Sequence, residues 1–244
     1  RFIAVKFYSG IILTNDDVLS WYVKHFQAKR KFLFFPIIQK DQDFRLLLEN
    51  ALPVSRMLED TYHLRGRQVL LFVGRLIDIK NLFFLLDTLA LVVNRYPKAI
   101  LLFVGDGDQR VALERHVERN GLADHVIFAG KKQGKDLYAC YNVGQIFVLP
   151  SYYERFGAVV NEALLAGCYT LCSSAAGAAC LVNPLENGAI FDSHSKDGLV
   201  EQLTVALDMT PVLSELRLKE NKMLNSYDTY FANFMNRLDD LLNK

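Results

Sequence analysis

The sequence predicts an α/β protein with a doubly wound parallel sheet, the Rossmann-like arrangement. From Gln68 onward, short apolar runs alternate with segments that are apolar at helical spacing. The short runs are apolar throughout instead of alternating with polar residues, which indicates strands that are buried on both faces. A regular alternation of such strands with helices produces a parallel sheet that is covered by helices on both sides.

The expected elements follow one another with clear boundaries. Gly74 and Gly105 end the first two strands, Pro97 stops the first helix, and Gly121 and Gly167 are expected to cap two later helices. The expected strands comprise residues 69–73, 99–104, 125–129, 145–149, 169–173 and 189–191. The expected helices comprise residues 81–95, 109–120, 135–141, 157–166 and 196–207.

Both ends of the chain depart from this rhythm. The first 67 residues predict a strand over 10–14, a helix over 17–27 capped by Asp16, and a strand over 31–35. Residues 41–64 are polar and irregular, with one expected helix, and residues 212–244 predict one or two helices. The chain begins with Arg1 and runs straight into an apolar segment, as expected of the middle of a longer protein. We expect three parts, namely 1–36, 37–212 and 213–244.

Composition narrows the class of protein. The 244 residues are 51% apolar and 23% charged, with a formal net charge of +1. Such a chain can form one or two domains with a core of their own. The near-neutral charge argues against a nucleic-acid partner, and no segment has the roughly 18 to 20 apolar residues of a membrane span. We expect a cytoplasmic location, with the inner face of the membrane as an alternative within it.

Four cysteines lack metal-binding spacing. Cys140, Cys168, Cys172 and Cys180 form no C-x-x-C pair, and no histidine lies close in sequence to complete a zinc set. We therefore expect small buried apolar residues in a reducing compartment.

Ligands of open parallel sheets bind at the carboxyl ends of the strands, so polar residues at those positions are the candidates. Gly74, Arg75 and Lys80 follow the first strand of the rhythm, Gly105-Asp-Gly-Asp108 follows the second, and the segment 150–157 follows the fourth. Taken alone, each has an ordinary explanation as a surface cation, a tight turn or a solvated helix face. Gly105-Asp-Gly-Asp108 is neither a dinucleotide fingerprint nor a calcium loop.

Together these segments resemble one family. The segment Pro150-Ser-Tyr-Tyr-Glu-Arg-Phe-Gly-Ala-Val-Val-Asn-Glu-Ala-Leu-Leu-Ala-Gly167 is similar to the donor-site signature of glycosyltransferase family four, a retaining family with the GT-B fold. Its two glutamates, Glu154 and Glu162, are separated by seven residues. Val73-Gly-Arg-Leu76 with Lys80, Val104-Gly-Asp-Gly107, Val126-Ile-Phe-Ala-Gly130 and Asn187-Gly188 match further motifs in the same order. The resemblance covers roughly residues 68–207.

The resemblance implies the C-terminal, donor-binding half of a hexosyltransferase. Arg75, Lys80 and Glu154 would be catalytic, with both cations on the diphosphate, Glu154 on sugar hydroxyls and Glu162 on the ribose hydroxyls. The implied donor-binding set comprises Gly74, Arg75, Lys80, Gly107, Lys132, Glu154, Phe156, Gly157, Ala158, Val159 and Glu162. A helix starting near Phe156 would present free N–H groups to the phosphate. Negative charge grows on the leaving diphosphate, so cations and this helix end would replace a metal, and no cofactor is expected.

The same resemblance implies partners and leaves rivals open. The donor would be a UDP-sugar, with GDP-mannose next, and the acceptor a saccharide or lipid-linked molecule in surface polysaccharide or glycolipid assembly. Most of the acceptor domain would be absent, and any peripheral membrane contact would be made by it, so this chain alone is expected to be inactive. Three motifs depart from the family, and one is the linker Pro36-Ile37-Ile38, which replaces the usual Pro-Asn-Gly. Cys168-Tyr169 replace Thr-Pro, and Ala178-Ala-Cys180 replace a segment that contains a glutamate. Alternatives are a non-catalytic nucleotide-binding module or another GT-B enzyme, such as a sugar-nucleotide epimerase or a phosphorylase.

Overall fold

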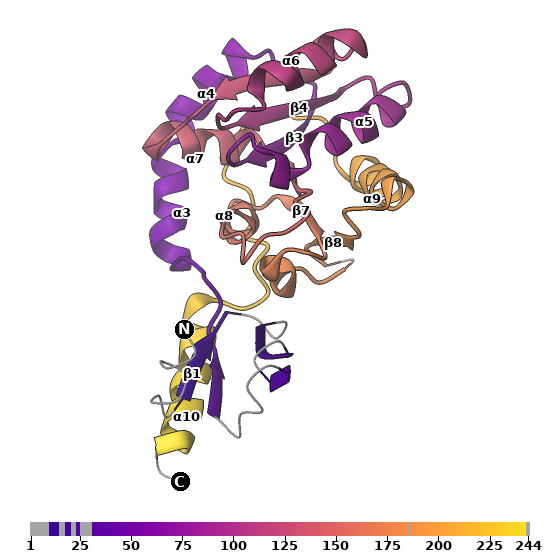
Figure 1. The fold of residues 1–244 in the computed structure, drawn as a ribbon. Coiled ribbons are helices and arrows are strands. Elements are labelled where there is room, and N and C mark those ends of the chain that lie inside the picture. Colours follow the sequence, from indigo (N-terminus) through magenta and orange to yellow (C-terminus); the bar gives the residue numbers. More distant parts are fainter. Residues whose placement is uncertain (1–9, 15–17, 21–22, 25–30, 185, 243–244) are drawn as a thin grey trace.

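The computed structural model describes residues 10–14, 18–20, 23–24, 31–184 and 186–242, and its centre is a six-stranded sheet (Figure 1). All strand pairs of this sheet are parallel, and the spatial order is β5-β4-β3-β6-β7-β8. The strands are β3 (Gln68–Val73), β4 (Ala99–Val104), β5 (Val126–Gly130), β6 (Ile146–Leu149), β7 (Tyr169–Ser173) and β8 (Gly188–Phe191). The fold is therefore the doubly wound, Rossmann-like α/β fold that the sequence predicts.

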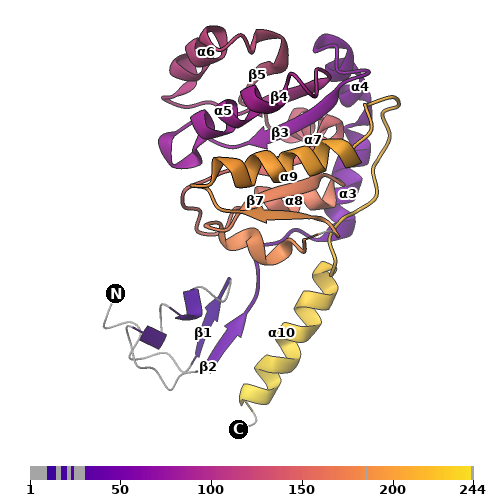
Figure 2. The same cartoon turned by 90° about the vertical axis from the view of Figure 1, so that its right-hand side faces the viewer.

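Helices cover the sheet on both faces (Figures 1 and 2). One face carries α5 (Leu82–Val92), α6 (Arg110–Arg119) and α9 (Lys196–Met209), with α5 packed against the other two. The other face carries α7 (Gly134–Val143) and α8 (Val159–Leu165), with α3 (Asp41–Asn50) and α4 (Leu52–Thr61) packed against α7. Single-turn helices η1 (Asp78–Lys80), η2 (Ala123–His125) and η3 (Gly177–Leu181) complete the connections. The split follows from right-handed crossovers that run in opposite directions from β3.

The core explains why the strands are apolar throughout. Residues 69–73 of β3 and all of β4 and β6 are buried. Phe72, Phe103 and Phe128 are register partners on three adjacent strands, with ring centroids 5.7 and 5.2 Å apart. This row of rings fixes the register of β3, β4 and β5, because a shift by one residue would turn the rings to the opposite face.

A smaller unit lies beside the sheet domain (Figure 1). The strands β1 (Gly10–Leu13) and β2 (Lys31–Phe34) pair in parallel, and α10 (Tyr227–Leu242) packs along β2. Phe35 makes edge-on contacts with Tyr227, Phe231 and Phe234, at centroid distances of 5.7, 6.4 and 5.5 Å. Strands from the N-terminal part of the chain and a helix from its C-terminal part therefore form one unit. Of the helix predicted over 17–27, residues 18–20 and 23–24 are helical, and the rest, with its cap Asp16, falls outside the described residues.

Two segments of the chain, residues 35–40 and 221–226, join this unit to the sheet domain, and hydrogen bonds hold them next to each other. The Gln39 N–H donates to Asn161 Oδ1 of α8 at 2.7 Å. Asp41 accepts from the Tyr227 N–H at 2.8 Å and from Asn221 Nδ2 at 3.1 Å, one hydrogen bond to each carboxylate oxygen. The chain thus crosses between the two units twice at neighbouring points. The boundaries at 36 and 212 stay a prediction.

One predicted region needs correction, and another is confirmed. Residues 41–64 hold two helices, not one, because the chain bends at Ala51 and Pro53 occupies the first turn of the second helix, where its missing N–H costs nothing. The described residues of 212–244 hold one helix, α10, in agreement with the prediction of one or two, and residues 211–226 run as a non-helical segment along the sheet domain. Within the described part of the chain, no helix is both long and apolar enough to cross a membrane.

Candidate functional site

The candidate site lies where the strand order reverses. The chain leaves β3 toward β4 on one side and returns to β6 on the other side of β3. In open parallel sheets this reversal opens a crevice at the carboxyl ends of the two strands. The loop 74–80 follows β3 and the loop 150–157 follows β6, so both border this crevice. The Tyr152 N–H donates to the Ile79 carbonyl at 3.0 Å and joins the two loops directly.

Gly107 lets the loops after β3 and β4 approach closely. The Leu76 N–H donates to the Asp106 carbonyl at 2.9 Å, and the Gln109 N–H donates to the Leu76 carbonyl at 3.0 Å. A Cβ atom on Gly107 would lie 2.3 Å from the Leu76 carbonyl oxygen, closer than any side chain can stand. Gly107 therefore shapes the crevice wall by admitting the backbone of Leu76, the residue after Arg75.

Lys80 and Glu154 meet in an ion pair across the crevice. The Lys80 ammonium contacts Glu154 Oε2, and the two side chains are 13% and 22% exposed. Gly74 lies beside Lys80, because a Cβ atom on Gly74 would be 3.9 Å from Lys80 Cε. Arg75 is exposed and makes no side-chain hydrogen bond or ion pair within the part of the chain that the structure describes. The site thus offers one paired and one unpaired cation.

Backbone hydrogen bonds join the loop 150–157 to the segment 175–178. Glu154 donates its N–H to the Ala175 carbonyl at 3.2 Å and accepts from the Gly177 N–H at 3.1 Å. The Phe156 carbonyl accepts from the Ala178 N–H at 2.7 Å, while the Phe156 ring is 3% exposed in the core. This fastening fixes Glu154 at the crevice and makes Phe156 an anchor for the loop.

The helix after this loop begins later than the sequence predicts. α8 starts at Val159, not near Phe156, because Gly157 has a φ of +93°, which is incompatible with a helix. A Cβ atom on Gly157 would lie 3.0 Å from Glu154 Cγ, so this residue lets the loop fold over the Glu154 side chain. The N–H groups of Gly157, Ala158 and Val159 donate to no described residue. They remain three donors at the start of α8.

Glu162 lies within α8 and is partly buried, with one carboxylate oxygen directed at an interior side chain. Its Oε2 accepts a 2.6 Å hydrogen bond from the hydroxyl of Tyr141, a residue that is itself fully buried. Burial raises the pKa of the Glu162 carboxyl, and the hydrogen bond from Tyr141 opposes that rise. Glu162 therefore does not join the Lys80–Glu154 pair, and no sequence spacing pointed to Tyr141 as its partner.

The remaining predicted residues are more scattered. Lys132 follows β5 at the edge of the sheet, two strands away from β3, and lies close enough to Cys140 to influence it electrostatically. Burial raises the pKa of Cys140 and of Cys172 to about 12. Cys140, Cys168 and Cys172 are buried as predicted, whereas Cys180, which lies in η3, is exposed. Sequence reasoning also missed His194, whose ring stacks on Tyr152 at 5.4 Å.

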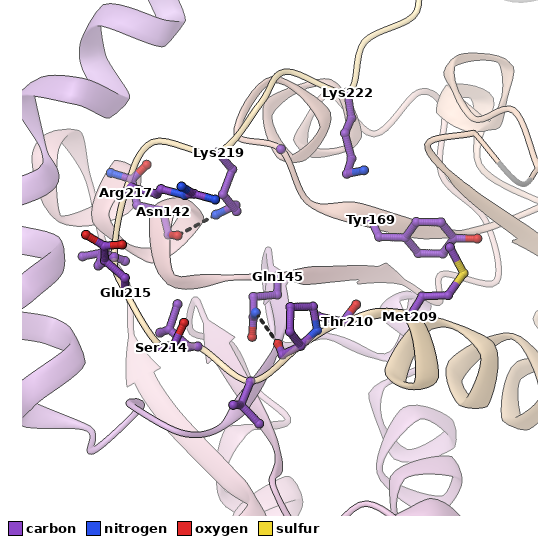
Figure 3. Close-up of a pocket in the computed structure, with 15 residues that line it drawn as sticks. Asn142, Gln145, Tyr169, Met209, Thr210, Ser214, Glu215, Arg217, Lys219 and Lys222 are labelled. Atoms are coloured by element: carbon purple, nitrogen blue, oxygen red, sulfur yellow. Dashed lines mark hydrogen bonds between the residues drawn. The ribbon is translucent and has the colours of Figure 1, made fainter.

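A cavity of about 400 Å³ lies at the opposite edge of the sheet (Figure 3). It is lined by Gln145 and Tyr169, at the amino ends of β6 and β7, and by the segment 209–222. Lys219 donates from Nζ to the carbonyls of Tyr141 and Asn142 at 3.1 and 2.5 Å, which caps the end of α7. Lys219 thus has a structural role, and the cavity is remote from the predicted site at the carboxyl ends.

Comparisons with known proteins find similar glycosyltransferases. An uncharacterized glycosyltransferase of Methanocaldococcus jannaschii is 34% identical over 67% of this chain and 41% of its own length. A 2-deoxystreptamine glucosyltransferase of Streptomyces kanamyceticus is 27% identical over 68% of this chain and 43% of its own length. The chain thus spans about two fifths of these relatives. The crystal structure of HepE from Anabaena in complex with UDP has a TM-score of 0.80, with 18% identity over 99% of this chain and 65% of HepE.

The sequence also matches a family as a whole. Residues 59–223 match the glycosyl transferases group 1 family, and this stretch includes β3 to β8 and every predicted site residue. On that match, the chain belongs to the group 1 glycosyl transferases.

Proposed function

We propose that this chain is the donor-binding half of a retaining, metal-independent hexosyltransferase and that it binds the diphosphate of a nucleotide sugar in the crevice between β3 and β6. One observation carries the proposal. Lys80 and Glu154 are paired at the reversal of strand order, and Arg75, which has no partner among the described residues, lies on the same loop as Lys80. Such a crevice is where open α/β sheets bind nucleotides, and cations of this kind bind phosphate oxygens.

The proposed diphosphate site consists of two cations and the start of α8. The Arg75 guanidinium can form bidentate hydrogen bonds with phosphate oxygens, and the Lys80 ammonium supplies a second, compact positive charge. The unpaired N–H groups of Gly157, Ala158 and Val159 add hydrogen bonds from the backbone. Charge grows on the leaving diphosphate during transfer, so contacts that strengthen with that charge lower the barrier.

The ion pair suggests how binding and chemistry are linked. When a diphosphate enters, Lys80 exchanges the Glu154 carboxylate for a phosphate oxygen. Glu154 then becomes available to accept hydroxyl groups of the sugar, which a carboxylate can do at both oxygens. The exchange replaces one charge-assisted contact with another, so the buried ammonium is never left without a partner.

The proposed donor is a UDP-sugar, with GDP-mannose as the next candidate, and the ribose hydroxyls are assigned to Glu162. HepE, the structural neighbour at 18% identity, was solved with UDP and also with UDP-glucose. The acceptor is proposed to be a saccharide or a lipid-linked molecule, in the assembly of surface polysaccharide or glycolipid. The acceptor-binding part is proposed to lie largely outside this chain, because the chain matches about two fifths of the length of these relatives.

Calorimetry with UDP and GDP tests the donor site, and NAD serves as the control nucleotide. We expect a dissociation constant of roughly 10 μM to 1 mM for one of the two diphosphates, and no binding of NAD. Absence of binding by either diphosphate at millimolar concentration would refute the proposal. A chain that binds NAD equally well would favour a general nucleotide-binding module.

A further inference from the structure

We infer that Tyr141 is a positioning residue for the ribose, because it holds one oxygen of Glu162 so that the other receives the ribose hydroxyls. The inference rests on the proposed function, in which Glu162 contacts the ribose. It adds a residue outside the donor motifs. The site should prefer ribonucleotides over nucleotides that lack the 2′- and 3′-hydroxyls.

Tyr141 is fixed at both its backbone and its ring. It lies in the last turn of α7, where its carbonyl accepts from Lys219 Nζ at 3.1 Å. The ring is fully buried, with centroids 6.3 Å from Phe44 and 6.5 Å from Phe147. A phenol enclosed in this way cannot rotate to another partner, so the direction of its O–H group is set by the core.

Glu162 receives that O–H group on one side only. Oε2 accepts from the Tyr141 hydroxyl at 2.6 Å, whereas Oε1 has no hydrogen bond with any described residue. A carboxylate oxygen has two acceptor positions, so Oε1 alone can accept both hydroxyls of a vicinal diol. The hydrogen bond from Tyr141 also fixes one orientation of the carboxylate. Oε1 can therefore accept the diol from one direction only.

The hydrogen bond from Tyr141 also stabilises the ionised form of the Glu162 carboxyl. Burial disfavours the ionised form of Glu162 and raises its pKa, and the Tyr141 hydroxyl counteracts this by donating to the charged form. A short O–H···O⁻ bond of this kind is among the strong hydrogen bonds of proteins. Without it, the carboxylate would be less charged, less directed and a weaker acceptor for the diol.

The test is Tyr141→Phe in the 244-residue chain, with UDP or GDP, whichever binds the wild type, compared with its 2′,3′-dideoxy analogue by calorimetry. Phenylalanine keeps the ring packing and removes only the hydroxyl. We expect affinity for the ribonucleotide to fall roughly tenfold and affinity for the dideoxy analogue to change less than twofold. Tyr96→Phe is the matched control. It removes a 2.7 Å hydrogen bond from another buried tyrosine to a carboxylate, that of Asp208 in α9. It should leave both affinities unchanged.

The outcomes separate the inference from the proposed function. Failure of the wild type to bind either nucleotide would refute the proposed function itself. Binding by the wild type with equal losses for both ligands in Tyr141→Phe, or with no loss, would refute the positioning role. A crystal structure of the wild type with the ribonucleotide tests the same point without a variant. We expect the ribose hydroxyls on Glu162 Oε1 with Tyr141 still on Oε2, and ribose oxygens away from Glu162 would overturn the inference.

Discussion

Replacing Glu154 with glutamine should tighten the binding of a nucleoside diphosphate while weakening the binding of the complete sugar donor. In the resting site the Glu154 carboxylate occupies the Lys80 ammonium, so a diphosphate must compete with it. The Glu154→Gln variant keeps the size of the side chain and removes the negative charge. Lys80 then becomes available to the phosphate without an exchange of partners, whereas the sugar loses a strong acceptor for its hydroxyls.

The magnitude follows from the charges. A phosphate oxygen bound to Lys80 would lie roughly 6 Å from the carboxylate, where two unit charges repel by about 3 kcal/mol at an effective dielectric constant of 20 and by less than 1 kcal/mol in water. The pair is 13% and 22% exposed, which places it between these limits. A relief of about 1 to 2 kcal/mol corresponds to roughly five- to thirtyfold tighter binding.

The assay is calorimetry with UDP, GDP and the matching UDP-sugar or GDP-sugar. Asp208→Asn is the control, because it removes the carboxylate of an exposed pair with Arg95 near the C-terminal end of α9, at the opposite edge of the sheet. This control should leave every affinity unchanged. If Glu154→Gln weakens the free diphosphate as much as Lys80→Ala does, then the carboxylate supports phosphate binding and the exchange mechanism is refuted.

Three further predictions concern catalysis and stability. In the complete enzyme, Arg75→Ala or Lys80→Ala should lower turnover a hundredfold or more, about 3 kcal/mol of transition-state stabilisation; a loss below about threefold with folding intact would remove their assigned role. Sugar transfer should survive EDTA, and abolition with rescue by manganese would overturn the metal-free mechanism. Glu162→Gln should raise the melting temperature at pH 8 but not at pH 4. Its folded-state pKa is raised, so the native state loses stability as pH rises through the range between the ordinary and the raised value. A lower melting temperature for this variant at pH 8 would contradict the reasoning.

Much of the sheet could be predicted from sequence, because its strands are buried on both faces and therefore apolar without interruption. Helix boundaries that depend on one glycine or one proline were harder to predict. The start of α8 was misplaced because Gly157 belongs to a left-handed turn that only the approach of Glu154 explains. The second helix of residues 41–64 was missed because Pro53 was not recognised as a first-turn residue.

The candidate site divides in the same way. Arg75, Lys80 and Glu154 stand in contiguous motifs at the ends of strands, so their loops could be assigned to one sheet edge from sequence. The Lys80–Glu154 contact spans 74 residues, and the Tyr141–Glu162 bond joins two helices through the core. Neither pairing has a sequence spacing of its own, because tertiary packing alone creates it.

The most direct test of the donor-site account is titration of the 244-residue chain and its Lys80→Ala variant with UDP and GDP at low and high salt, beside a transfer assay. We expect one diphosphate to bind the wild type and to bind more weakly as salt rises, because two cations meet a polyanion. The variant should bind more weakly and depend less on salt. Transfer by the chain alone should fail, because the acceptor must be held in line with the sugar carbon. Salt-independent binding that is unchanged in Lys80→Ala would contradict the account, as would sustained sugar transfer by this chain alone.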